Sequence, residues 1–232
     1  MCQKFHDENV LNVKASRLQV DEIWSFVYCK AKNVLRSGGD HNTGDAWTWT
    51  AIDPETKLIV GWLVGRRDSY SANAFMKDIQ YRLSNRVQLT SDGYKSYIDA
   101  VEIAFKDNVD FAQLKKIYGK PIRNGEIDNR VQYLRSEKIT ITGNPDERFV
   151  STSHVERHNL FMRTHIKRYT RKTNAFSKKF QNHCYSCAIW FVYYNFVRVN
   201  PGTEETPAMR AGLADRPLTI LEIVNLSCKN SK

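Results

Sequence analysis

An alternating run at residues 18–28 restricts the possible folds more than any other feature of this sequence. The run reads Leu-Gln-Val-Asp-Glu-Ile-Trp-Ser-Phe-Val-Tyr, and apolar side chains fall on both sides of it when it is extended. Because side chains alternate between the two faces of a strand, this pattern predicts a strand that is covered on both sides. Two further strands are expected at 46–53 and 58–65, and the Asp-Pro-Glu-Thr-Lys turn between them predicts a hairpin. We therefore expect three antiparallel strands in this part of the chain.

The rest of the chain alternates between helix and strand and then becomes helical. The elements that we expect are a helix at 71–84 capped by Ser71, a strand at 87–92, a helix at 94–106, a strand at 111–118, a polar loop at 119–136, a strand at 138–142, and helices at 153–168 and 174–198. A strand that is reached through a helical crossover lies parallel to its neighbour. This element order is that of an RNase H-like domain: an α/β fold whose mixed sheet, three antiparallel strands and then parallel strands, is flanked by helices and followed by a helical C-terminal part.

We divide the chain into three parts. Residues 1–17 are expected to be a loosely attached N-terminal arm, residues 18–198 to form the RNase H-like domain, and residues 199–232, with three prolines, to form a C-terminal tail of short pieces. The longest apolar run has about ten residues, half of what a membrane-spanning helix needs. The N-terminal stretch lacks an apolar signal-peptide segment, so we expect the protein to stay in the cytoplasm.

The positive charge is concentrated in one stretch. The chain has a net charge of +10, and residues 151–190 contain eight basic residues and a single acidic one. Such a block is typical of a surface that binds a polyanion, although a solvated helix face would have the same composition. It argues against a glycosidase, because neutral sugars need no such field. The residues that we expect to contact DNA are Arg157, His158, Arg163, Lys167, Arg168, Arg171 and Lys172.

Three acidic residues occur in unusual positions. Asp21 lies inside an apolar strand, where a charge is costly unless it is paired or binds a metal, although it could instead lie at an exposed edge or beside a cation. Asp92 ends a strand before Gly93, which is a common place for active-site groups but also suits a turn or an N-cap. Glu156 opens a helix amid positive charge, and with Ser153 it also matches a capping box.

Taken together, these three acids predict a metal site. Two aspartates on neighbouring strands and a glutamate on a helix beside them can hold two Mg²⁺ or Mn²⁺ ions. Two such ions about 4 Å apart activate a water or a 3′-hydroxyl and stabilise the leaving oxygen of a phosphodiester. Helical spacing also places Glu156, Arg163 and Lys167 on one helix face, so the basic residues would hold the DNA backbone near the metal.

Other polar residues give weaker indications. His154 and His158 flank Glu156, and they either touch phosphate or the metal-bound water or have surface and packing roles. Glu22 and Asp53 are expected to face solvent or a turn rather than to add to the acidic group. No Gly-rich phosphate loop is present, so ATP is not implied.

The five cysteines predict neither a disulfide framework nor a complete zinc site. Their number is odd, and a framework of disulfides is not expected without a secretion signal. Cys184 and Cys187 have zinc-knuckle spacing but lack a second pair, so we interpret them as two small apolar side chains on a buried helix.

Three short blocks around the acids resemble the motifs of a known family. They read Gln-Val-Asp21-Glu-Ile-Trp-Ser-Phe, Thr-Ser-Asp92-Gly-Tyr-Lys-Ser-Tyr and Ser-His-Val-Glu156-Arg-His-Asn, and successive acids are separated by 71 and 64 positions. These blocks resemble the acidic blocks of bacterial insertion-sequence transposases of the Asp-Asp-Glu class, most closely the insertion-sequence-one type. Arg163 resembles the basic residue that this class often carries seven positions after the glutamate, and the segment 206–215 resembles the family's ending.

The resemblance covers about residues 18–224 and implies a catalytic domain that nicks transposon ends and joins the 3′-hydroxyl to target DNA. It implies that Asp21, Asp92 and Glu156 are catalytic metal ligands for Mg²⁺ or Mn²⁺, with two ions per site, and that Arg163 and nearby basic residues contact DNA. Joining two ends requires two active sites, so a homodimer or a larger assembly is expected. Transposases of this type usually carry an N-terminal zinc finger and helix-turn-helix. Only about 17 residues precede the first block here, so a separate DNA-binding region or subunit would read the ends.

Two other functions would use the same residues. An RNase H-like nuclease would cut DNA without joining it. A DNA-binding remnant or regulator of a transposase would bind DNA without chemistry. Divalent-metal-dependent cleavage separates the two enzymes from the regulator.

Overall fold

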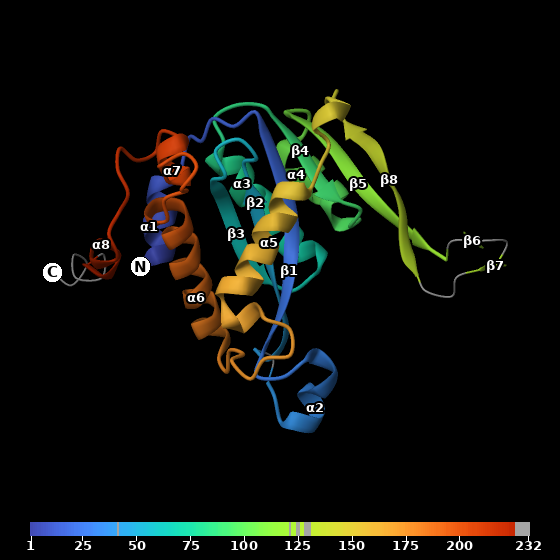
Figure 1. Ribbon diagram of the computed structural model, residues 1–232, viewed down its shortest axis with the longest axis horizontal. Helices are drawn as coiled ribbons and strands as arrows, with labels where there is room; N and C mark the ends of the chain where they lie inside the picture. Colours follow the sequence, from blue (N-terminus) through green and yellow to red (C-terminus); the bar gives the residue numbers. More distant parts are fainter. Residues whose placement is uncertain (41, 121, 124–125, 128–130, 226–232) are drawn as a thin grey trace.

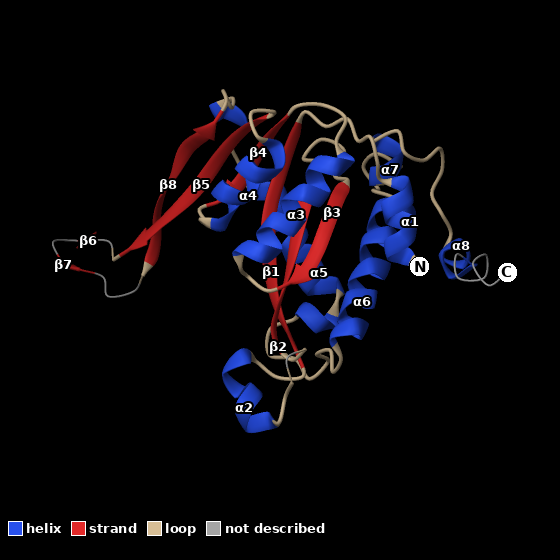
Figure 2. Ribbon diagram, turned by 180° about the vertical axis from the view of Figure 1, so that it is seen from behind, coloured by secondary structure: helices blue, strands red, loops and turns tan. Residues whose placement is uncertain are grey.

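The computed structural model describes residues 1–40, 42–120, 122–123, 126–127 and 131–225. Six strands form one sheet in the order β3-β2-β1-β4-β5-β8 (Figures 1 and 2). Their bounds are β1 (Arg17–Val27), β2 (Gly44–Ile52), β3 (Ile59–Gly65), β4 (Val87–Asp92), β5 (Val109–Gly119) and β8 (Gln132–Thr142). Strands β6 (Ile122–Arg123) and β7 (Glu126–Ile127) pair antiparallel in a separate two-stranded sheet beyond the far end of β5 and β8.

The strand pairing confirms the predicted RNase H-like architecture. Strand β2 pairs antiparallel with both β1 and β3, which forms the expected meander. Strand β4 is parallel to β1, and β5 is parallel to β4, because a helix connects each of these strands to the one before it in the chain. Strand β8 closes this side of the sheet antiparallel to β5.

The helices lie on both faces of the sheet. They are α1 (Cys2–Asn9), α2 (Val34–Ser37), α3 (Ser69–Arg82), α4 (Ser96–Phe105), α5 (Ser153–His165), α6 (Phe180–Val192), α7 (Pro207–Arg210) and α8 (Ile220–Asn225), with a π-helix, η4 (Tyr193–Val197), directly after α6 and short 3-10 turns η1 (Ala31–Asn33), η2 (Glu147–Phe149) and η3 (Lys167–Tyr169). Helices α3 and α4 cover one face, and α5 crosses the opposite face over β1 (Figures 1 and 2). Among the described residues, no helix is both long and apolar enough to cross a membrane.

The N-terminal residues pack into the core instead of forming a loose arm. Helix α1 lies beside α6 (Figure 1), and the side chain of His6 is fully buried. Val10 and Val13 after this helix are also buried, and Val13 pairs with Leu83 in an isolated bridge. The expectation of loose attachment is wrong because these apolar side chains fill space that the sheet leaves open. The domain boundaries at 1–17, 18–198 and 199–232 stay predictions.

Several element ends differ from the expected ones. Helix α3 is capped by Asp68, whose carboxylate accepts a hydrogen bond from Ser71 N, so Ser71 is not the cap. Part of the predicted loop at 119–136 belongs to β8, which pairs with β5 but is mostly exposed and so lacks an apolar pattern. Helix α6 begins at Phe180 rather than at 174. The other residues of that loop at 121, 124–125 and 128–130, and Cys228, lie outside the described residues.

Candidate active site

Strand β1 carries two adjacent acids whose side chains point to opposite faces of the sheet. Asp21 faces α5, where Asn159 Nδ2 donates a hydrogen bond of 2.9 Å to Asp21 Oδ2. Glu22 faces α4, where the Tyr97 hydroxyl donates a hydrogen bond of 2.8 Å to Glu22 Oε2. The geometry of a strand fixes this division, because successive side chains leave it on opposite sides. Of the two acids, Asp21 therefore faces the helix that carries Glu156.

Asp92 ends the neighbouring strand and lies beside Asp21. The parallel register of β1 and β4 brings the two residues level with each other. One oxygen of Asp92 accepts a hydrogen bond of 2.9 Å from Tyr94 N, so this acid also forms the turn that its sequence allowed. The other oxygen lies 3.8 Å from Nη2 of Arg67, which follows β3. The structure thus places Asp92 near Asp21 and gives it a cationic neighbour.

Glu156 lies in the first turn of α5 and is bound by residues outside that helix. Lys116 Nζ, from β5, lies 2.7 Å from each oxygen of the carboxylate, and Thr152 Oγ1 donates to Oε1 at 2.5 Å. Within the described residues at this helix end, Thr152 is the N-cap and its side chain makes no cap bond, so the capping box with Ser153 does not form. Glu156 is therefore not occupied with capping its own helix.

The pKa values of the two acids on β1 are both raised. Burial, and then the charges of neighbouring acids, raise the pKa of Asp21 to about 7; these neighbours are Glu22, Asp92 and Glu156. Burial and the charge of Asp92 also raise the pKa of Glu22, against the opposing effect of Arg67, whose Nε lies 2.5 Å from Glu22 Oε1. Negative charge therefore accumulates around the desolvated carboxylate of Asp21, which favours the binding of a cation.

Asp21 and Glu156 border a pocket of about 480 Å³ between β1 and α5, which we call the acidic pocket. Its lining residues are Asp21, Glu22, Ile23, Glu156, Asn159, Leu160, Arg163 and Arg171. Asp92 lies next to this lining but is not part of it. A pocket that brings carboxylates and guanidinium groups together can take a metal ion and a phosphate side by side.

The chemistry of the acidic pocket fits a divalent metal. Carboxylate oxygens are the ligands that Mg²⁺ and Mn²⁺ prefer, and a bound dication would relieve the repulsion that raises the pKa of Asp21. In the part of the chain that the structure describes, no three Asp, Glu, His or Cys side chains are already grouped to hold an ion. The contacts explain this, because Glu156 binds Lys116 and Asp92 lies near Arg67. Binding of an ion would require Glu156 to exchange its lysine for the metal.

Three of the residues expected to contact DNA lie at or near the acidic pocket. Arg163 and Arg171 line it, and Lys172 follows in the same exposed turn. The guanidinium group of Arg163 is also held in place by a hydrogen bond of 3.1 Å, which its Nη1 donates to Tyr169 O. Burial and the nearby charge of Arg171 lower the pKa of Arg163. An anion in the pocket would therefore reduce the repulsion between these two arginines.

The other four residues of that set are divided among different places. Helix α5 ends at His165, so Lys167 lies in η3 and not on the helix face that carries Glu156. Arg168 donates a hydrogen bond of 2.9 Å to Ser177 Oγ. Arg157 is exposed on the side of α5 away from the acidic pocket. His158 is 3% exposed and does not line the acidic pocket.

Sequence reasoning missed three side chains that bind the acids. Asn159 follows Glu156 by three positions, and this helical spacing was the one signal that could have identified it. Lys116 and Arg67 gave no such signal, because they reach the site from β5 and from the turn after β3. Glu22 was expected to face solvent or a turn, and this is wrong, because its side chain is 1% exposed. The turn role expected for Asp53 is confirmed, since Oδ1 accepts a hydrogen bond from Glu55 N.

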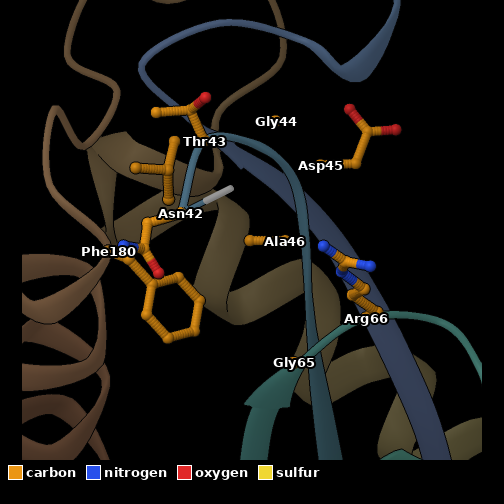
Figure 3. A pocket seen from close by; sticks show the side chains of 9 residues that line it. Asn42, Thr43, Gly44, Asp45, Ala46, Gly65, Arg66 and Phe180 are labelled. Atoms are coloured by element: carbon orange, nitrogen blue, oxygen red, sulfur yellow. The ribbon is translucent and has the colours of Figure 1, made fainter. Parts of the chain in front are cut away.

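A smaller hollow at the other end of β2 lacks a comparable group of charges. It has a volume of about 200 Å³, and Figure 3 shows Arg66 and Asp45 on one side of it and Asn42 and Phe180 on the other. Asp45 pairs with Phe26, five positions along β1 from Asp21 and so about 16 Å away. Its lining offers a single carboxylate and a single guanidinium group, so the acidic pocket remains the candidate active site.

Comparisons with known proteins do not assign a function to this chain, so a functional assignment depends on the residues of the site. No protein-family model matches the chain, and no curated protein matches it. A solved structure of a piggyBac transposase synaptic complex with hairpin DNA is similar to this chain, with a TM-score of 0.39 and 9% sequence identity. The similarity covers 94% of this chain and 49% of that one, so this chain spans about half the length of the solved protein. A likeness at this level carries no argument about function.

Proposed function

We propose that residues 18–198 form the catalytic domain of a metal-dependent DNA strand transferase, a transposase of the Asp-Asp-Glu class and of the insertion-sequence-one type. The observation that supports this most is that Asp21, Asp92 and Glu156, from β1, β4 and α5, lie near one another, and that the charges of the other two acids help to raise the pKa of the desolvated Asp21. On this proposal the protein acts on transposon ends and target DNA in the bacterial cytoplasm. It works as a homodimer or larger assembly, because two ends need two active sites.

Each group in the proposed site has a distinct task. The three acids would hold one or two Mg²⁺ or Mn²⁺ ions, which when bound activate a water or a 3′-hydroxyl and stabilise the leaving oxygen of the phosphodiester. Asn159 orients Asp21 through its hydrogen bond. Arg163 and Arg171 bind the phosphate of the DNA strand in the same pocket. Lys116 neutralises Glu156 before the metal binds.

A DNA-binding regulator without chemistry is the second candidate. The ion pair between Lys116 and Glu156 favours it, because a glutamate that keeps its lysine is not available to a metal. An RNase H-like nuclease would use the same acids as the transferase, and it differs only in what attacks the phosphodiester. The three functions are therefore separated by their products.

A strand-joining assay tests the proposal. The full chain is incubated with labelled, pre-nicked DNA and a plasmid in Mg²⁺, in Mn²⁺ and in EDTA, next to the variants Asp92→Asn and Glu156→Gln. We expect joined product with either metal and none in EDTA. Both variants should reduce joining to background while keeping their affinity for DNA, because each removes a charged ligand and leaves the basic residues in place.

A matched control uses Glu102→Gln, an exposed acid on α4 away from the site. This variant should join DNA like the unchanged protein. Cutting without joining would favour the nuclease, and binding without any product would favour the regulator. Full activity in Asp92→Asn would overturn the assignment of the acids.

A further inference from the structure

A second pocket lies on the other side of α5 and is positively charged. It has a volume of about 540 Å³ and is bordered by the turn between β2 and β3, by α5, and by η4 with the residues that follow it. We call it the cationic hollow, and its charged and titratable lining residues are Lys57, His154, Arg157, His158 and Arg198. Of its lining residues, only Leu160 also lines the acidic pocket. The two pockets therefore use different charged groups.

Among the residues that the structure describes, the cations of this hollow form no ion pair with an acid. Within the described chain, no carboxylate forms an ion pair with Lys57, Arg157 or Arg198, and Lys57 Nζ lies 3.1 Å from His154 Nδ1. Arg198 lies over the ring of Phe161, with 4.5 Å from its Cζ to the ring centre, and this contact holds the guanidinium group at the hollow. The positive charge is thus left for a ligand to neutralise.

The nearest acids are occupied elsewhere. Asp53 accepts hydrogen bonds from Glu55 N at 2.8 Å and from Thr56 Oγ1 at 2.6 Å, so it stabilises its own turn. The carboxylate of Glu55 lies 2.5 Å from Arg17 Nη2. Burial and then the charge of Arg210 lower the pKa of Lys57, and only Asp53 opposes them. Among the described residues, Asp53 is thus the acid whose charge reaches Lys57 and His154, and it forms no ion pair with either.

His158 adds an independent sign of a missing ligand. It is 3% exposed and lines the hollow, yet within the described residues neither ring nitrogen has a hydrogen-bond partner. Its ring is held by Phe191, at 5.9 Å and 19°, and by Tyr194, at 4.6 Å and 79°. Burial lowers its pKa to about 3, so the ring is neutral and carries one N–H donor. An unsatisfied buried group of this kind destabilises a fold unless a ligand supplies the missing partner.

We propose that the cationic hollow binds a phosphate group, with Lys57, Arg157 and Arg198 supplying the charge and His158 donating a hydrogen bond to a phosphate oxygen. A phosphate carries acceptor oxygens and negative charge together, which is what these four side chains lack. The phosphate belongs either to a nucleic acid strand or to a small molecule. This site lies on the opposite side of α5 from the acids and needs no metal.

Calorimetric titration of the full chain in EDTA tests the proposal. The probes are inorganic phosphate and a short single-stranded oligonucleotide, each added to the unchanged protein and to the variants Arg157→Ala and His158→Phe. We expect the dissociation constant for inorganic phosphate to rise about tenfold in each variant, since a hydrogen bond to a charged group is worth about 1.5–3 kcal/mol. Arg157 is exposed, so its variant should fold even if His158→Phe does not.

The control is Lys77→Ala, an exposed cation on α3 at the opposite face of the sheet. Its affinity for phosphate should equal that of the unchanged protein. Competition between the oligonucleotide and phosphate would identify a nucleic acid strand as the source, whereas phosphate binding without competition would identify a small molecule. No binding of phosphate, or an equal loss in the control, would overturn the proposal. Because the titration contains no metal, its outcome is separate from that of the joining assay.

Discussion

Helix α5 separates a pocket that contains carboxylates from one whose charged side chains are all cationic. On one side, Glu156 and Asn159 border the acidic pocket beside Asp21, and on the other side His154 and Arg157 border the cationic hollow. Each pair is three positions apart, because 3.6 residues per turn bring positions i and i+3 onto one face. The comparison teaches that one helix can separate a site for cations from a site for anions by little more than its own width, about 10 Å.

A third polar group shows what a purely structural cluster looks like. The Tyr169 hydroxyl lies 2.5 Å from Thr48 Oγ1, 3.2 Å from His183 Nε2 and 3.0 Å from Cys187 Sγ. The other ring nitrogen of His183 contacts Ser177 Oγ at 2.9 Å. These groups are neutral and satisfy one another, whereas the two pockets on either side of α5 are lined by charged side chains. Surplus charge therefore marks the sites that are candidates for ligands.

The largest expected effect is on the free energy of unfolding when the charge of Asp21 is removed. The pKa of Asp21 is about 7 in the folded protein and about 3.9 in an unfolded chain. The folded protein therefore binds the proton more tightly, and the resulting stabilisation is fully present below about pH 4. This stabilisation is lost as the pH rises through 7. We expect Asp21→Asn, which resembles the neutral acid, to increase the free energy of unfolding at pH 8 by on the order of 3 kcal/mol. Thermal unfolding of both proteins from pH 4 to 8 measures the difference.

Two controls sharpen that measurement. The difference between the two proteins should vanish near pH 4, and Glu102→Gln, an exposed acid on α4 beyond its first turn, should show none at any pH. The buried histidines His158 and His183, whose lowered pKa values disfavour the fold in acid, affect both proteins alike. Added Mg²⁺ should stabilise the unchanged protein and not Asp21→Asn. An equal midpoint at pH 8 would show that the pocket does not strain Asp21.

A smaller effect is expected in the satisfied cluster. Tyr169→Phe removes the hydroxyl that Thr48, His183 and Cys187 share, and the ring stays in place. We expect a loss of about 1–3 kcal/mol in the free energy of unfolding, measured by urea denaturation. Tyr185→Phe, an exposed residue on α6, is the control and should change little. If both variants lose the same amount, the cluster does not contribute to stability as its contacts suggest.

The smallest effect concerns the DNA backbone. Arg171 is exposed at the acidic pocket, and on the proposed function it contacts one phosphate. Arg171→Ala should weaken DNA binding a few-fold and reduce the slope of log affinity against log salt by about 1. Fluorescence anisotropy at several salt concentrations measures both quantities. Lys32→Ala, an exposed cation outside both pockets, should leave the slope unchanged; a reduced slope there would mean that general charge, and not the pocket, binds DNA.

Much of the sheet was predictable because its pattern is local. The alternation in β1 and the turn between β2 and β3 indicate strands without any knowledge of their neighbours. Strand β8 was missed before residue 138, because its exposed side chains gain their conformation from pairing with β5. Helix α5 stops before its predicted end, since Ile166 is extended and the next turn places Tyr169 in the buried cluster. These ends depend on distant contacts.

The sequence by itself determined which acids share a strand or a helix, because backbone periodicity is a local property. Only the tertiary structure decided what surrounds them. Asp21 meets Asn159 across 138 positions, and Glu156 meets Lys116 across 40. Burial and the charge of distant neighbours set the pKa of Asp21, and burial leaves His158 neutral and, among the described residues, without a hydrogen-bond partner. Spacing along the chain specifies the face to which a side chain points. The pKa and the hydrogen bonds of that side chain depend on the groups that folding brings next to it.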